Sequence, residues 1–151
     1  MPSQDPMPAE LERKLYYDGI HLFNTHEFFE AHETWEDVWR RACGLKHAYY
    51  QGMIQCAVAL EHYRRGNPRG VQSLFRSYPP KFRNLSPVFM GLDVAGFLER
   101  MKLALAPMLD SDSPRAREQI ELDLGHAPHI ELLYDPFETG EAQTYNRQAG
   151  F

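Results

Sequence analysis

The sequence has little cysteine and no long apolar run, and both absences narrow the class of protein. Its two cysteines, Cys43 and Cys56, are too few for a disulfide framework and lack CxxC or His-paired zinc spacing. No apolar run approaches the roughly 20 residues needed to cross a bilayer, and the first residues, MPSQDPMPAELERK, have neither a basic start nor a hydrophobic stretch. We therefore expect no membrane association, reduced thiols and a cytoplasmic location.

The motifs of several catalytic classes are also missing. There is no GxSxG elbow, no glycine-rich phosphate loop and no cysteine directly beside a histidine. The sequence therefore gives little support to nucleophilic catalysis, and it names no cofactor.

What is present is the composition of an ordinary globular domain. Hydrophobic residues make up 43% of the chain and charged residues 25%, which is too apolar for intrinsic disorder. A chain of 151 residues buries roughly two thirds of its unfolded surface, so one core is expected. No internal repeat or linker divides the chain. We predict a helical-bundle domain over residues 8–109 and a partly irregular C-terminal extension over 110–151, packed on the bundle or trailing from it.

Apolar residues recur at three- and four-residue steps, which predicts an all-α fold, a compact single-domain bundle of about five helices. The first helix is expected over 8–23. Its apolar stripe consists of Leu11, Leu15, Tyr16, Gly19, Ile20, Leu22 and Phe23. Thr25 is the expected N-cap of a second helix over 26–42, and Gly44 stands where a C-terminal glycine is expected.

Three further helices are expected to complete the bundle. The third, over 45–65, is apolar nearly all round, which indicates a central, buried element. The fourth begins near Pro68 and must break or kink at residues 79–80, both proline. Asp93 is the expected cap of the fifth, whose apolar residues repeat at helical spacing. These residues are Val94, Phe97, Leu98, Met101, Leu105 and Met108.

The chain beyond Leu109 is rich in proline and acidic residues, which indicates a surface tail. A short helix over 115–124 fits the pattern there. No segment alternates long enough to predict a strand, and Ile130–Tyr134 is the best short candidate.

The most informative stretch is FFEAHETWEDVW, residues 28–39, in which polar residues fall inside an apolar helical face. Its aromatic and aliphatic side chains share one broad face at about 100° per residue. His32 and Glu36 fall inside that face, one turn apart, while Glu33 lies at its edge and Glu30 outside. Buried polar groups must be hydrogen-bonded or paired, so we expect partners on a neighbouring helix.

The third helix offers such partners. Gln51, Gln55 and His62 lie within about 40° of one another, beside small residues that permit close helix approach. We therefore hypothesise that the two inward side chains of the second helix, His32 and Glu36, meet these three side chains across the helix interface.

Three interpretations of this cluster stay open. The first is a buried polar network that fixes helix register and needs no ligand. The second is a site for a small ligand or a reaction, with Glu36 or His32 as general base and the glutamines orienting the substrate. The third is a metal site, because histidine and glutamate one turn apart can share an ion.

The metal interpretation has specific weaknesses. The motif is HExxE rather than the two-histidine HExxH of zinc enzymes. A di-iron bundle needs carboxylates where the third helix has glutamines. His126 and His129 flank a proline, which is typical of a loop. We assign no metal ligand.

Charge is distributed unevenly along the chain. The formal net charge of -5 argues against a generic nucleic-acid binder. Between Lys46 and Asn84, however, seven basic residues accompany a single acid, Glu61. The basic segment over 64–83 is either a solvated surface or an interaction module for an acidic partner or nucleic acid.

Two segments carry a family resemblance. FFEAHETWEDVW, within Asn24–Trp39, and QGMIQ, at Gln51–Gln55, occur together at a characteristic separation, ahead of His62 and the Gly-Asn pair at 66–67. This combination, spanning about Tyr17 to Leu98, resembles the family catalogued as domain of unknown function 309. The resemblance implies a compact helical bundle and no settled activity.

The resemblance also singles out residues without giving them roles. The family's characteristic polar positions correspond to Glu30, His32, Glu33, Glu36, Gln51, Gln55 and His62. The sequence departs from the family pattern at Pro79-Pro80, which interrupts a helix, and after Asp110.

We therefore expect an uncharacterised small helical protein, a monomer or small homo-oligomer, whose polar cluster is a structural network or a pocket for a small ligand. His32 and Glu36 are the candidate catalytic residues. The candidate ligand-binding residues are Glu30, Glu33, Gln51, Gln55 and His62. The alternatives are a metal-dependent or general-base hydrolase centred on His32 and Glu36, and the interaction module over 64–83.

Overall fold

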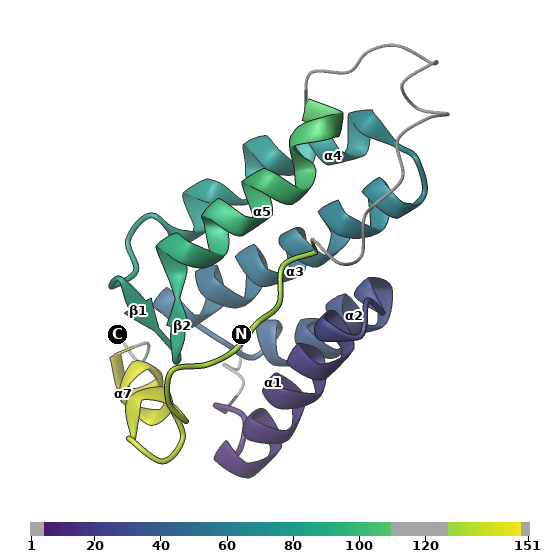
Figure 1. Ribbon diagram of the computed structural model, residues 1–151. Helices are drawn as coiled ribbons and strands as arrows, with labels where there is room; N and C mark the ends of the chain where they lie inside the picture. Colours follow the sequence, from purple (N-terminus) through teal and green to yellow (C-terminus); the bar gives the residue numbers. More distant parts are fainter. Residues whose placement is uncertain (1–4, 110–126, 149–151) are drawn as a thin grey trace.

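The computed structural model describes residues 5–109 and 127–148, and it confirms the expected all-α fold. The helices are α1 (Ala9–Asn24), α2 (Phe28–Trp39), α3 (Gly44–Arg64), α4 (Pro68–Ser77), α5 (Val94–Leu109) and α7 (Glu141–Gln148). A 3-10 turn, η1 (Pro79–Phe82), and a hairpin of β1 (Val88–Phe89) and β2 (Leu92–Asp93) join α4 to α5. Figure 1 shows α3 between the α1–α2 pair and the α4–α5 pair. None of the helices in these ranges is long and apolar enough to cross a membrane.

The first helix buries a face rotated from the one we predicted. Its buried residues are Glu12, Tyr16, Gly19, Ile20 and Phe23. Leu11, by contrast, is 41% exposed, and Leu15 and Leu22 are only half-buried. The face is rotated because a carboxylate, Glu12, enters the core with its own ion partner, and the leucines beside it are displaced toward solvent.

Close packing between α1 and α2 depends on Gly19. A Cβ atom at this position would lie 2.0 Å from Nε1 of Trp35, far inside van der Waals contact. The Trp35 indole N–H donates to the Tyr16 carbonyl at 3.3 Å, so the ring is fixed against the backbone of α1. Trp35 is fully buried in consequence.

The turn between α1 and α2 differs from the prediction. Thr25 ends α1 instead of capping α2, since its hydroxyl donates to the His21 and Leu22 carbonyls. His26 follows with a φ of 67°, a left-handed conformation that terminates the helix. The second helix is therefore shorter than expected, and Gly44 begins α3 where it was expected to close α2.

The central helix and the break after α4 follow the sequence closely. α3 begins and ends within one residue of the expected bounds. Asn67 caps α4 by accepting a hydrogen bond from the Gly70 N–H at 3.3 Å, and Pro68 occupies the first turn. The proline pair ends α4 and opens the 3-10 turn, as its missing N–H groups require.

The short hairpin before α5 was not predicted. β1 and β2 pair antiparallel around a two-residue turn, Met90-Gly91, in which both residues have positive φ angles. Such turns usually place asparagine or glycine first, so Met90 is an unusual residue there. Ile130–Tyr134, the expected strand candidate, is not a strand, although the Leu133 N–H donates to the Gly91 carbonyl.

The fifth helix confirms its predicted cap and spacing. The Asp93 carboxylate accepts a hydrogen bond from the Gly96 N–H at 3.2 Å. The predicted apolar residues are buried, apart from half-buried Leu98. The expected short helix over 115–124 lies outside the described residues.

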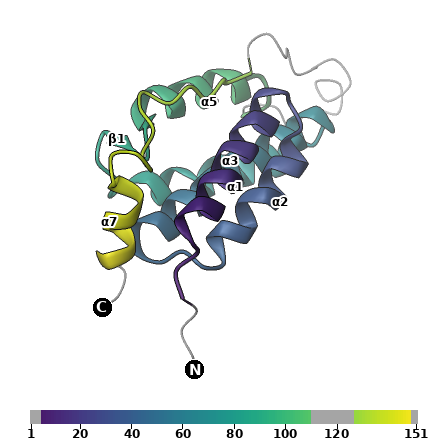
Figure 2. The same cartoon turned by 90° about the horizontal axis from the view of Figure 1, so that it is seen from below.

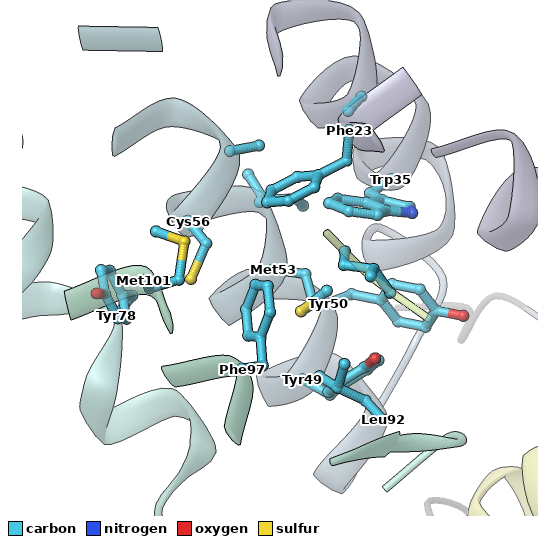
Figure 3. Packing of buried hydrophobic residues seen from close by; sticks show 14 of the residues in the cluster. Phe23, Trp35, Tyr49, Tyr50, Met53, Cys56, Tyr78, Leu92, Phe97 and Met101 are labelled. Atoms are coloured by element: carbon cyan, nitrogen blue, oxygen red, sulfur yellow. The ribbon is translucent and has the colours of Figure 1, made fainter. Parts of the chain in front are cut away.

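The core is aromatic and centred on α3. Figure 3 shows Phe23 and Trp35 on one side of Met53, with Phe97 and Met101 from α5 on the other. The rings of Phe23 and Trp35 are 6.0 Å apart, and those of Phe23 and Phe97 are also 6.0 Å apart. α3 therefore contributes to both halves of one continuous core, as its nearly uniform apolar circumference predicted.

The chain from residue 127 returns to the bundle. The Asn24 side chain accepts from the Ile130 N–H at 2.7 Å and donates to the Ile130 carbonyl at 2.9 Å. Further along, α7 lies beside β1 in Figures 1 and 2, and the Tyr145 ring stacks on Phe89 at 4.5 Å. Residues 127–145 thus pack on the helices and do not trail from them.

Candidate functional site

One side of α3 is partly open to solvent. Between Lys46 and Tyr63, the residues that are not buried are His47, Ala48, Gln51, Gln55, Val58 and His62. At about 100° per residue they fall within one strip about 100° wide, and every other side of this part of the helix is covered. The predicted ligand-binding residues of α3 therefore share the accessible strip of the central helix.

The predicted catalytic pair lies at the surface edge of α2, not in the core. The buried residues of α2 are Phe28, Ala31, Trp35 and Val38. The His32 side chain is 18% exposed and the Glu36 side chain 32%. The prediction of burial was wrong because the buried face is narrower than expected, which also leaves Phe29 at 43% exposure.

The open sides of α2 and α3 adjoin near the turn that connects them. The Trp39 ring stacks on the His47 imidazole, with centroids 5.0 Å apart and planes at 29°. Trp39 continues the edge of α2 that carries His32 and Glu36. We call this surface the polar face. It consists of His32, Glu36, Trp39, His47, Gln51, Gln55 and His62.

His32 and Glu36 contact one another on the polar face. Nδ1 of His32 lies 2.8 Å from the Phe29 carbonyl oxygen. Nε2 of His32 lies 3.5 Å from Oε1 of Glu36, which is also 3.8 Å from Nη2 of Arg40. The structure therefore brings the predicted catalytic pair together.

The predicted contacts across the α2–α3 interface are not formed. Oε1 of Gln55 accepts a hydrogen bond from the Ser77 hydroxyl of α4 at 3.0 Å, and Nδ1 of His62 pairs with the Asn67 side-chain amide at 3.0 Å. Gln51 has no hydrogen bond within the described part of the chain. Gln55 and His62 thus pair with α4 and with Asn67, the N-cap of α4, and not with α2.

The remaining predicted residues, Glu30 and Glu33, point to solvent. Glu33 and Glu36 line a shallow hollow of about 350 Å³ together with Arg40. In residues 5–109 and 127–148, no three His, Cys, Asp or Glu side chains converge as a metal site requires.

His47 is a residue of the polar face whose surroundings shift its pKa. Burial, and next the positive charge of Lys81 on η1, lower the pKa of its imidazole below the usual 6.5. The neutral ring is therefore favoured at this position, ready to donate and accept one hydrogen bond each.

A buried polar network does exist, but in a place that the sequence analysis missed. Glu12 and Lys46 are each 2% exposed, and Nζ of Lys46 donates to Oε1 of Glu12 at 2.7 Å. The Tyr50 hydroxyl donates to the other carboxylate oxygen at 2.8 Å, and Lys46 also donates to the Ala142 carbonyl at 3.2 Å. Each of these polar atoms has a partner inside the protein, which is typical of a structural network.

Two more tyrosines extend this network toward the hairpin. The hydroxyls of Tyr16 and Tyr49 are 2.6 Å apart, and the Tyr16 hydroxyl donates to the Met90 carbonyl at 2.8 Å. Burial raises the pKa of both phenols well above their ordinary value. Helical spacing could have revealed the network, because Glu12 stands four residues before Tyr16, and Lys46 three before Tyr49, on the stripes that become buried.

The segment that carries the polar face is shared with known proteins. Residues 16–74 match the model of the family described as Domain of unknown function (DUF309), which confirms the predicted resemblance. The chain is 36% identical over 95 residues to Uncharacterized protein YpuF of Bacillus subtilis (strain 168), covering 59% of this chain and 53% of that protein. It is 27% identical over 95 residues to an uncharacterized protein of Aquifex aeolicus (strain VF5), covering 60% and 28%. The chain thus spans about half the length, or less, of these curated relatives.

Proposed function

We propose that this domain binds a small polar molecule on the polar face, through His32 and Glu36. The proposal is based on the segment that matches the family model and on the hydrogen bonding of His32. The matched residues 16–74 include all of α2 and α3, the two helices that form this face. The proposed ligand carries an N–H or O–H donor.

The tautomer of His32 carries this proposal. A carbonyl oxygen only accepts, so the contact with Phe29 requires the ring proton on Nδ1. In the neutral ring, Nε2 then presents a lone pair to the Glu36 carboxylate at 3.5 Å. Two acceptors at this distance repel one another unless a donor or a proton lies between them. His32 and Glu36 are thus preorganised to accept a hydrogen-bond donor between them.

The chemistry of the donor follows from the surroundings. Glu33 and Glu36 are acidic, and Gln51, on the accessible strip of α3, has no hydrogen bond within the described residues. A nitrogen cation with several N–H groups, such as a guanidinium or amidinium, satisfies two acceptors at once and is attracted by the acids. We therefore assign the ligand to cationic or amide-bearing small molecules.

A general-base hydrolase is the second candidate, and the same lone pair supports it. When the donor is a water molecule, Nε2 of His32 is placed to take its proton and Glu36 to stabilise the resulting imidazolium. This function predicts turnover, whereas the first predicts reversible binding alone. The cytoplasmic location and the monomeric or small oligomeric state stay predictions.

Nitrogen-detected NMR tests the tautomer first. We expect the His32 imidazole in the wild-type protein near pH 8 to show the proton on Nδ1. A ring with the proton on Nε2 would remove the acceptor pair and with it the proposal.

Titration with methylguanidinium then tests binding. We expect saturable shifts of α2 and α3 resonances in the wild type, lost in His32→Ala and Glu36→Gln. Glu30→Gln is the matched control, because it removes one exposed carboxylate of the same helix away from the pair. Equal weakening by all three variants would mean general attraction to an acidic helix and would contradict a specific site.

Stability measurements separate binding from a structural role. Because His32 and Glu36 are partly exposed, replacing either one should lower the free energy of unfolding by less than about 1 kcal/mol. A loss of roughly 3 kcal/mol or more would indicate the register-fixing role instead.

A further inference from the structure

A second cavity lies between α4 and α5, apart from the polar face. It has a volume of about 390 Å³, within the range of small-molecule sites. Its lining residues are Gln72, Phe75 and Arg76 from α4, and Lys102, Ala106 and Leu109 from α5.

Two cations, Arg76 and Lys102, line this cavity, and within residues 5–109 and 127–148 neither has an acidic partner. Neither Arg76 nor Lys102 forms an ion pair or hydrogen bond with any residue of the described ranges. Arg64 and Arg65, by contrast, do have an acidic partner, since both pair with Glu61, at 2.6 and 2.7 Å. The two positive charges around this cavity repel one another, and an anion bound between them would be attracted to both.

The charged and apolar parts of the cavity lie at different ends. Gln72 of α4 donates to the Met108 carbonyl near the end of α5 at 3.0 Å, which fixes how the two helices align. α4 and α5 run in opposite directions (Figure 1), so Arg76, one turn further along α4, lies toward Lys102. Ala106 and Leu109 follow Lys102 by one and two turns, and with Phe75 they form the apolar part.

We infer that this α4–α5 cavity binds an amphipathic organic anion, with a carboxylate held by Arg76 and Lys102 and a short apolar chain against Phe75, Ala106 and Leu109. Both cations are long enough to converge on one head group, and charge-assisted hydrogen bonds to a carboxylate are among the stronger polar contacts. The head group would lie two turns from the carbonyl end of α5, away from its negative dipole. The site shares no residue with the polar face.

Calorimetric titration of the full chain with octanoate, below its micellar concentration, tests this inference. Octanol, which lacks the charge, and inorganic phosphate, which lacks the chain, are the two partial probes. We expect saturable binding of octanoate, and binding of each partial probe weaker by roughly tenfold or more, about 1.4 kcal/mol. Phosphate binding as tight as octanoate would leave only an anion site and would overturn the amphipathic class.

Variants locate the binding. Arg76→Gln/Lys102→Gln should weaken octanoate binding by about tenfold or more, while the matched control Arg69→Gln/Arg83→Gln removes the same charge from exposed positions outside the cavity and should change it less than about twofold. Ala106→Phe, at an exposed helical position, should fill the cavity and abolish binding without unfolding the protein. Equal losses in both double variants, or unchanged binding in Ala106→Phe, would refute the site.

Discussion

The ion pair between Glu12 and Lys46 joins α1 to α3 inside the core. Each side chain is 2% exposed, and both carboxylate oxygens accept hydrogen bonds, one from Lys46 and one from Tyr50. The cost of removing two charges from water is offset only while these contacts are complete. Replacing only one of the two residues therefore destabilises the protein mainly because the other charge stays buried without a partner.

We predict that Lys46→Met lowers the free energy of unfolding by about 3–5 kcal/mol, because it strands the Glu12 carboxylate in the core. Glu12→Gln/Lys46→Met should recover most of that loss, since the glutamine oxygen still accepts from Tyr50. Urea denaturation at pH 7 measures both. A double variant as unstable as the single one would mean that the uncompensated charge is not the cause.

At the scale of elements, Gly19 determines how closely α1 and α2 approach. Replacing an interior helical glycine by alanine usually stabilises a helix by about 1 kcal/mol. Here the added methyl group would collide with the Trp35 indole, which is itself hydrogen-bonded to α1.

We therefore predict that Gly19→Ala destabilises the protein by about 1–3 kcal/mol, in spite of its better helix propensity. Thermal unfolding followed by circular dichroism measures the change. Ser73→Ala, on the exposed side of α4, is the control and should change stability by less than about 0.5 kcal/mol. A Gly19→Ala protein as stable as the wild type would show that Trp35 can move aside freely.

Element order and most helix bounds were predictable because spacing, caps and prolines act locally. Asn67, Asp93 and the proline pair act within one turn of themselves, and each ended or began a helix where expected. The choice of which side chains of α1 and α2 are buried was not predictable to the same degree, since periodicity defines only a broad apolar face. Which part of that face is buried depends on Gly19 and on the partner of Glu12.

The candidate site was predictable in part for the same reason. His32 and Glu36 are one helical turn apart, so their contact follows from the sequence alone. The partner of Gln55 depended on where α4 folds back, because Ser77 lies 22 residues further along the chain. His62 pairs with Asn67, only five residues away, in the turn before α4. The contact between Gln55 and Ser77 therefore has no local sequence pattern.

At the scale of the whole molecule, three fully buried tyrosines connect α1, α3 and the hairpin. Tyr16, Tyr49 and Tyr50 lie around one another, with ring centroids 5.6–6.2 Å apart. Burial is the largest cause that raises the pKa of each phenol. Their protonated forms are thus part of the folded state.

The sign of the pH effect follows from these pKa directions. A phenol titrates near pH 10 when unfolded and higher when buried, so above pH 10 the unfolded chain binds fewer protons and stability falls as pH rises. We predict that the three buried phenols contribute their full stabilisation below pH 10 and that the protein unfolds cooperatively above pH 10. Absorbance at the tyrosinate band should rise together with the loss of helical circular dichroism. Ionisation of all eight tyrosines while the helices stay intact would contradict the prediction.

The carbonyl of Ala142 that Lys46 requires stands 96 residues later in the chain. During synthesis on the ribosome, α1, α2 and α3 emerge long before it, so the nascent bundle must hold an ammonium group whose last acceptor has not yet been made. The end of the bundle near Lys46 is therefore expected to stay hydrated until α7 has been synthesised and closes over it.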